Sequence, residues 1–265
     1  MSNRRRDIPE RMKAAAADRF GPPSVLKLRD LPVPKPGPGE VLIRLVTAGV
    51  GSWDASIREG SWRRPGRPRF PLVPGTDGAG VIVAKGSRVS RFRVGDRVYA
   101  YEFGNPQGGF YAEFAVAAAR HVGRIPKALD MHAAGAATTT GLTALQGVEA
   151  LRLRPRETVL IFGASGAVGT MAVQFAAQRG ARVLATASGK PAIRLVRTLG
   201  ARKVVDARAE DAIAELRTAA PSGLDAIFAL AGGTELERCM NLLRPRGRVV
   251  YPNGNARLVT RGVST

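Results

Sequence analysis

Three consecutive segments decide the fold: Thr158–Phe162 (TVLIF), Gly163–Gly169 (GASGAVG) and Thr170–Ala177 (TMAVQFAA). The apolar run predicts a buried strand, the glycines a tight turn, and the third segment a helix. Such a turn lets backbone N–H groups and the helix N-terminus approach a pyrophosphate. The alternative is a turn whose small residues serve packing alone. The predicted ligands are Gly163, Ser165, Gly166, Ala167, Val168 and Gly169.

The segment that follows indicates which dinucleotide binds. Arg182–Ala187 predicts the next strand, and an NAD-selective site places Asp or Glu at its end, about 20 residues after the glycines. No carboxylate occurs between Glu157 and Asp206. Cations and hydroxyl donors suit a 2′-phosphate, so we predict NADP(H) as the cofactor. The residues expected to contact this phosphate are Ser188, Lys190 and Arg194.

Composition favours a globular protein that handles a small molecule. The chain has 265 residues, 45% of them hydrophobic, enough for two modest domains with substantial cores. No apolar run approaches membrane-spanning length, and no apolar stretch follows the charged start, so we expect neither a membrane protein nor a secretory signal. The single cysteine, Cys239, cannot form an internal disulfide, which favours the cytoplasm.

The charge is strongly positive, with 41 lysines and arginines against 21 acidic residues. A net charge of +20 predicts weak, non-specific binding of polyanions. The arginines are scattered, however, and no nucleic-acid-binding module with interleaved aromatic residues is visible. We therefore do not expect a dedicated nucleic-acid partner.

The chain divides into an extension and two domains. Residues 1–11 are expected to be a disordered extension, which leaves either Met1 or Met12 as the start. Residues 12–125 contain short strands separated by Gly and Pro turns, which predicts a β-barrel-like domain. Residues 126–265 alternate strands with helices, which predicts a doubly wound parallel sheet. The candidate strands of this sheet are 158–162, 182–187, 203–206, 224–230 and 248–251.

Six segments in order along residues 12–254 carry a resemblance to a known family. They are Pro36–Leu42 (PGPGEVL), Pro74–Val81 (PGTDGAGV), Phe92–Val98 (FRVGDRV), Gly108–Phe114 (GGFYAEF), Thr140–Ala144 (TGLTA) and the Gly163 turn. Through them the chain resembles the medium-chain dehydrogenase/reductase superfamily, in its zinc-free quinone oxidoreductase (zeta-crystallin-like) branch. The resemblance implies a GroES-like β-barrel domain followed by a Rossmann domain that binds NADP(H).

The same resemblance implies a reaction. NADPH would give a hydride to a quinone or an α,β-unsaturated carbonyl, and the product oxygen would take its proton from water. Thr139 and Thr143 would flank the nicotinamide, with Ser52, Asp54 and Thr143 at the reacting centre and Asn253 on the cofactor. The alternatives are that both threonines bond their own helix backbone and that Asp54 has a structural role. Zinc-free alcohol dehydrogenase and enoyl reductase are the competing enzyme classes.

The chain departs from the family in several places. Zinc-dependent relatives have a Cys where Gly51-Ser52 stands here and a His where this chain has the segment Gly75–Asp77. The whole chain contains one cysteine and two histidines, which predicts no metal site. An Asn of the family is Gly51 here, and a Tyr near the adenosine is Ala207. Trp53 and Trp62 could line the pocket or pack in the core.

The end of the chain gives a further expectation. The family's sheet has a sixth strand that pairs two subunits, and residues 252–265 do not clearly supply it. We therefore expect a C-terminally truncated chain with an open strand edge, reduced stability and an impaired homodimer. A remnant that binds NADPH or polyanions without turnover is the alternative to an active reductase.

Overall fold

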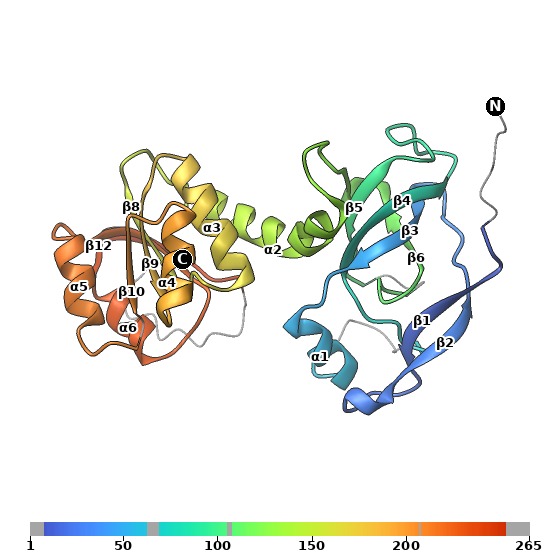
Figure 1. Cartoon of the computed structure of the whole chain (residues 1–265), viewed down its shortest axis with the longest axis horizontal. Coiled ribbons are helices and arrows are strands. Elements are labelled where there is room, and N and C mark those ends of the chain that lie inside the picture. The colour runs from blue at the N-terminus through green and yellow to red at the C-terminus, as the bar shows by residue number, and fades with distance from the viewer. Residues whose placement is uncertain (1–7, 63–68, 105–107, 207, 253–265) are drawn as a thin grey trace. The chain divides into compact units, whose positions relative to one another are not determined.

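The computed structural model describes residues 8–62, 69–104, 108–206 and 208–252. These residues divide into two compact units, one up to Thr139 and the other from Thr140. Helix α2 (Met131–Ala150) contains this boundary and contributes residues to both units. The larger sheet of the first unit is antiparallel and that of the second is parallel (Figure 1).

The first unit is built on a five-stranded antiparallel sheet with the order β6-β3-β4-β5-β7. Its strands are β3 (Glu40–Ala48), β4 (Asp77–Lys85), β5 (Arg97–Tyr101), β6 (Phe114–Ala118) and β7 (Val122–Arg124). The pairing of β3 with β4 changes register between Leu42 and Ile43 and again between Leu45 and Thr47. Such irregularities bend and twist a sheet. The sheet therefore curves into a half-barrel, as the sequence predicts for this part of the chain.

Shorter elements surround this sheet. They are β1 (Arg11–Ala17) paired with β2 (Leu26–Pro32), the 3₁₀ turns η1 (Pro23–Val25) and η2 (Ala119–His121), and α1 (Ser52–Glu59). Helix α1 follows Gly51 and ends at Gly60, whose φ of 78° suits a residue without a side chain. The main core of the unit gathers Ile43, Phe92 and Phe110, all essentially inaccessible to solvent.

The second unit is a five-stranded parallel sheet with the order β10-β9-β8-β11-β12. Its strands are β8 (Thr158–Phe162), β9 (Arg182–Ala187), β10 (Lys203–Asp206), β11 (Leu224–Ala229) and β12 (Leu243–Val250). In addition to α2, the helices of this unit are α3 (Ala167–Gln178), α4 (Lys190–Thr198), α5 (Ala212–Ala219) and α6 (Thr234–Met240). The predicted doubly wound parallel fold is confirmed.

Helices cover both faces of this sheet because its strands are apolar on both sides. In β8, Val159 and Ile161 pack into the core shared with α2, α3 and α4, while Leu160 and Phe162 pack into the core shared with α5 and α6. Alternate residues of a strand face opposite sides, so the continuous run TVLIF supplies both cores. The buried strand predicted from this run is confirmed.

Strand β12 begins earlier than the sequence predicts. The sequence places it at 248–251, whereas the structure pairs Leu243 with Leu224 and then resumes at Arg248 opposite Ala226. Between these points Arg246 adopts a positive φ of 67° and interrupts the register. The segment RPRG therefore looks like a loop in the sequence but forms an irregular part of the strand.

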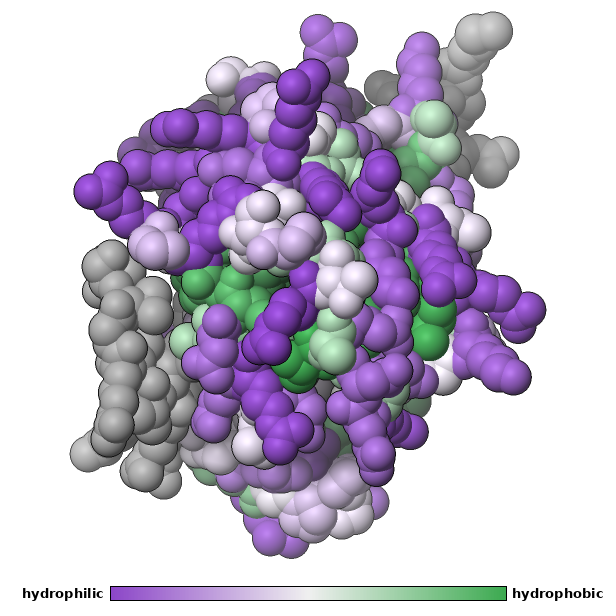
Figure 2. All heavy atoms as spheres, turned by 90° about the vertical axis from the view of Figure 1, so that its left-hand side faces the viewer, coloured by the Kyte–Doolittle hydropathy of each residue, from purple (hydrophilic) through white to green (hydrophobic). Residues whose placement is uncertain are grey.

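On the face shown in Figure 2, polar and charged side chains surround small apolar areas, as expected for a chain with 41 lysines and arginines. Among the described residues, no helix combines the length and the apolar character needed to cross a membrane.

Candidate functional site

The glycine turn lies at the carboxyl end of β8, where β9 holds it in place. The N–H of Gly163 donates to Oγ1 of Thr186 at 2.9 Å, and the N–H of Ala164 donates to the carbonyl of the same threonine at 2.8 Å. Gly163 has a φ of 84°, which a side chain would strain. One threonine of β9 therefore fixes both residues that open the turn.

The turn fits an anion at the start of α3. Gly166 precedes this helix and has no side chain to cap it, and the opening N–H groups of any helix have no acceptor inside the helix. A Cβ added to Gly166 would meet only the Gly163 carbonyl, at 3.7 Å, so the space in front of the turn is open. Ser165 and Ala167 are exposed and Val168 is half-buried. This cradle is suited to a pyrophosphate.

Gly169 has a different role in the same turn. It is buried, and a Cβ there would lie 2.6 Å from both Cα of Ala164 and the carbonyl oxygen of Gly163. The missing side chain lets α3 approach the end of β8 closely, which brings the helix N-terminus to the turn.

A second set of polar groups lies at the end of β9. Ser188 is half-buried, and a Cβ on Gly189 would meet nothing within 4 Å. Lys190 and Arg194 are exposed and lie one turn apart on α4. The N–H of Gly189 donates to Oδ2 of Asp206 at 3.4 Å. The sequence showed no carboxylate near this turn, and only the pairing of β10 with β9 brings one there.

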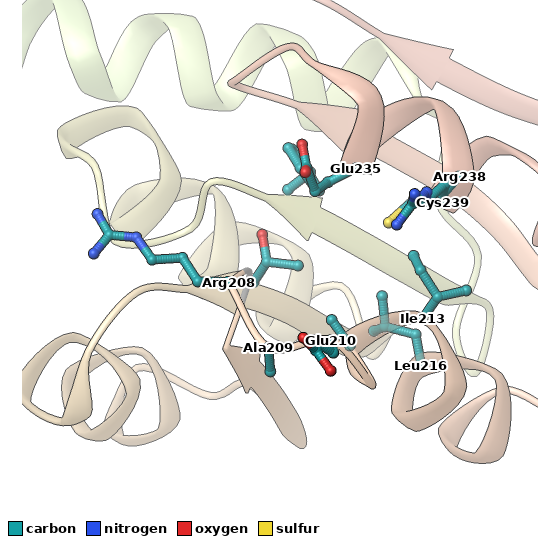
Figure 3. A pocket seen from close by; sticks show the side chains of 11 residues that line it. Arg208, Ala209, Glu210, Ile213, Leu216, Glu235, Arg238 and Cys239 are labelled. Carbon is teal, nitrogen blue, oxygen red and sulfur yellow. The ribbon is translucent and has the colours of Figure 1, made fainter.

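A pocket of about 220 Å³ lies at the same edge of the sheet, between the ends of β8 and β9 and helices α5 and α6 (Figure 3). Its lining residues are Phe162, Thr186, Arg208, Ala209, Glu210, Ala212, Ile213, Leu216, Glu235, Arg238 and Cys239. Its base is apolar and its rim carries charges of both signs. The sequence predicted none of it, although parallel strands bring their carboxyl ends to one edge.

Cys239 belongs to this pocket as a packed side chain. It is 1% exposed, and burial raises the pKa of its thiol to about 11. A protonated thiol is a poor nucleophile and a small apolar group. The prediction that Cys239 is a packed hydrophobe agrees with this burial.

In the first unit, Asp54 is the centre of a buried polar cluster. One carboxylate oxygen accepts from the Gly51 N–H at 2.8 Å and from the Tyr111 hydroxyl at 3.1 Å, and the other accepts from the Gly75 N–H at 3.2 Å. Burial, and then the charge of Asp54, raises the pKa of the Tyr111 hydroxyl. The carboxylate ties α1 to two separate segments of the unit.

Asp77 forms the neighbouring part of this cluster. It is 2% exposed and accepts the N–H of Thr139 at 2.9 Å, while burial raises the pKa of its carboxyl. Beside it, Nε1 of Trp53 donates to Oγ1 of Thr76 at 3.0 Å. The cluster is therefore closed by hydrogen bonds within the unit.

Two family models match the chain in the order that the fold shows. Residues 37–127 match the alcohol dehydrogenase GroES-like domain, and residues 167–253 match zinc-binding dehydrogenase. Quinone oxidoreductase of Rattus norvegicus is 36% identical over 242 residues, which are 90% of this chain and 72% of the rat protein. The chain belongs to the quinone oxidoreductase branch of the medium-chain dehydrogenase/reductase superfamily.

Solved structures agree with this assignment. A mycobacterial protein in complex with NADPH matches with a TM-score of 0.78 at 31% identity, over 90% of this chain and 72% of that one. An NAD-dependent alcohol dehydrogenase matches with a TM-score of 0.83 at 33% identity, over 90% and 76%. The predicted family and the predicted GroES-like and Rossmann folds are confirmed.

Gly51, where the family often has Asn, is explained by its neighbour. A Cβ on Gly51 would lie 2.5 Å from Cδ2 of Trp53 and closer still to two other indole atoms. The half-buried indole therefore occupies the space that a side chain at position 51 would need. Trp62, in contrast, is 48% exposed and packs on Phe103 with ring centroids 5.3 Å apart.

The remaining predicted site residues are placed as follows. Ser52 is exposed at the start of α1, and Thr139 and Thr143 are half-buried on α2, on the two sides of the boundary between the units. Asn253 and Ala207 lie outside the described residues. The roles assigned to Ser52, Thr139, Thr143 and Asn253 stay predictions.

The candidate metal ligands are dispersed. Nδ1 of His121 lies 3.1 Å from Oε2 of Glu102, His132 is exposed at the start of α2, and Cys239 belongs to the second unit. Within the described ranges, no three His, Cys, Asp or Glu side chains gather into a group that could hold a metal ion.

Proposed function

We propose that this chain is an NADPH-dependent, zinc-independent reductase that transfers a hydride to a quinone or an α,β-unsaturated carbonyl. The observation that carries the proposal is the open anion cradle at Gly163–Gly169, continued by a hydroxyl and two cations at the end of β9. When bound, NADPH supplies the hydride. The chain's own residues bind it, orient it and hold the acceptor.

Each part of the cofactor has a matching group in the second unit. The first turn of α3 would bind the pyrophosphate through backbone N–H groups, while Ser188, Lys190 and Arg194 would bind the 2′-phosphate. The pocket between α5 and α6 has an apolar base and a volume of about 220 Å³, which suits an adenine ring. Its residue Thr186 also holds Gly163, so the adenosine and pyrophosphate subsites share one support.

The acceptor class follows from what the first unit can supply. Quinones and enones are already electrophilic, so positioning and exclusion of water provide most of the rate. Asp54 accepts three hydrogen bonds within its own unit, which favours a positioning role over acid catalysis. The product oxygen would take its proton from water.

Zinc independence rests on the donor set. The positions that hold Cys and His in zinc-dependent relatives are Gly51-Ser52 and Gly75–Asp77 here. At the second position the Thr76 hydroxyl already accepts from Trp53 and the Asp77 carboxylate accepts the Thr139 N–H, and at the first neither Gly51 nor Ser52 supplies a thiolate or an imidazole. A zinc-free alcohol dehydrogenase would share this donor set, and oxidation of alcohols by NADP⁺ distinguishes it.

The test is a titration followed by turnover. NADPH and NADH are titrated separately, and 1,4-benzoquinone is then added while absorbance of the reduced nicotinamide is followed. We expect tighter binding of NADPH and its oxidation by the quinone. Lys190→Ala should weaken NADPH binding about tenfold and leave NADH nearly unchanged, whereas Arg197→Ala, an exposed cation on the same helix, should change neither. Binding without oxidation by quinone or enone would refute the reductase and leave the cofactor site standing.

A further inference from the structure

Asp206 brings a carboxylate to the turn that we assign to the 2′-phosphate. It is the last residue of β10, and its Cα pairs in parallel register with Ala187, the last residue of β9. Oδ2 accepts the N–H of Gly189 at 3.4 Å, and Oδ1 accepts the N–H of Arg208 at 3.0 Å. The carboxylate is therefore fixed between the loop after β9 and the loop that lines the adenine-sized pocket.

The Asp206 carboxylate takes part in no ion pair found among the described residues of the second unit. Those ion pairs are Arg179–Glu149, Lys203–Glu215, Arg244–Asp225 and Arg248–Glu157. Backbone N–H groups orient a carboxylate but do not cancel its charge. Because Asp206 is only partly exposed, solvent screens it less than a free surface carboxylate.

We propose that Asp206 is a specificity-determining residue that weakens the preference of this chain for NADPH over NADH. The inference rests on the cofactor site proposed above. A 2′-phosphate bound by Ser188 and Lys190 would be repelled by the carboxylate held at Gly189, whereas a 2′-hydroxyl could donate a hydrogen bond to it. Selectivity is then the balance between the cations of α4 and one opposing charge from β10.

A structural role for Asp206 predicts something different. If the carboxylate only shapes the turn, its loss weakens every adenosine ligand equally. If its charge opposes the phosphate, Asp206→Asn selectively strengthens ligands that carry a 2′-phosphate, because asparagine keeps an acceptor oxygen and loses the charge. The ratio of two affinities separates these cases, and Asp206→Glu, which keeps the charge, should stay close to the wild-type ratio.

The probes are 2′,5′-ADP (adenosine 2′,5′-bisphosphate) and 5′-AMP, which differ only in the 2′-phosphate and carry no nicotinamide. Their affinities for the full chain are measured by calorimetry at low and high salt. We expect Asp206→Asn to strengthen 2′,5′-ADP binding about three- to tenfold, with 5′-AMP binding unchanged or weaker and the gain smaller at high salt. Asp211→Asn removes the same charge from an exposed residue before α5 and should leave the ratio unchanged.

The outcomes are distinguishable. Equal changes for both probes, or the same shift in Asp211→Asn, would overturn the specificity role of Asp206. An unchanged ratio in Asp206→Asn, with wild type binding 2′,5′-ADP, would overturn it and leave the proposed cofactor site intact. Failure of wild type to bind either probe would refute the cofactor site and this inference with it.

Discussion

Two glycines of the same turn should fail in different ways when each is changed to alanine. A methyl group on Gly169 would lie 2.6 Å from two backbone atoms, which cannot move without displacing α3 from the end of β8. Overpacking of this kind costs about 1–3 kcal/mol of unfolding free energy. A methyl group on Gly166 would meet only one carbonyl oxygen, at 3.7 Å, and the φ of −76° there suits any residue. Alanine is a poorer N-cap than glycine by about 0.5–1 kcal/mol, but it also reduces the freedom of the unfolded chain by about 0.4–1 kcal/mol, so the net change in stability should be small.

NADPH affinity should also distinguish the two variants, because Gly166→Ala is expected to lose binding without losing stability. Gly166→Ala places its methyl group in the open space where we expect the pyrophosphate, so NADPH binding should weaken at least tenfold in a fully folded protein. Gly169→Ala should weaken both stability and binding, because the displaced helix no longer presents its N–H groups.

Each unit has its own probe of unfolding. Trp53 and Trp62 lie in the first unit, so their emission follows that unit, while far-ultraviolet circular dichroism is weighted towards the helices of the second. In urea, Gly169→Ala should lower the midpoint of the dichroism transition and leave the tryptophan transition nearly in place. Equal dichroism midpoints for the two alanine variants would refute the packing argument for Gly169, and undiminished NADPH binding by Gly166→Ala would refute the pyrophosphate site at Gly166.

Two further predictions concern contacts that the sequence did not reveal. Gly51→Ala should destabilise the first unit by about 1–3 kcal/mol because the indole of Trp53 occupies the space that the new methyl group needs. Trp53→Ala in the same chain should recover part of that loss. If urea unfolding shows that the effects of the two substitutions simply add, the proposed clash is wrong. Hydrogen bonds from Arg248 lower the pKa of Glu157 below its usual value, so this group adds stability above its unfolded pKa and loses it as pH falls through the folded pKa. Glu157→Gln should therefore cost about 1–2 kcal/mol at neutral pH and progressively less below pH ~4; a cost that does not change with pH would contradict this linkage.

The fold could be predicted because its evidence is local in the sequence. In β8, an unbroken apolar run supplies both faces of the sheet, and the glycines follow directly, so strand, turn and helix are recognisable from neighbouring residues. The start of β12 was predicted wrongly because the strand continues through a segment with a proline and two arginines, whose pairing depends on β11.

The site could be predicted only where it is a continuous segment. The spacing of residues indicated the pyrophosphate turn, but it did not indicate that Thr186 holds Gly163 or that α5 and α6 enclose a pocket. Those contacts depend on which strands are neighbours and in what register. The roles of Asp54, Thr139 and Thr143 were taken from a resemblance, and they stay predictions until the variants are measured.

Asp206 shows why an absence in the sequence is a weak argument about a site in three dimensions. No carboxylate occurs at residues 158–205, between Glu157 and Asp206, which favours a 2′-phosphate at Ser188. Yet parallel pairing places the end of β10 beside the end of β9, so the first carboxylate beyond that span returns to the same turn. Cofactor preference therefore depends on residues at the carboxyl ends of both β9 and β10, and not on the segment after β9 alone. A selectivity for NADPH well below that expected from Lys190 and Arg194 alone would be the direct consequence.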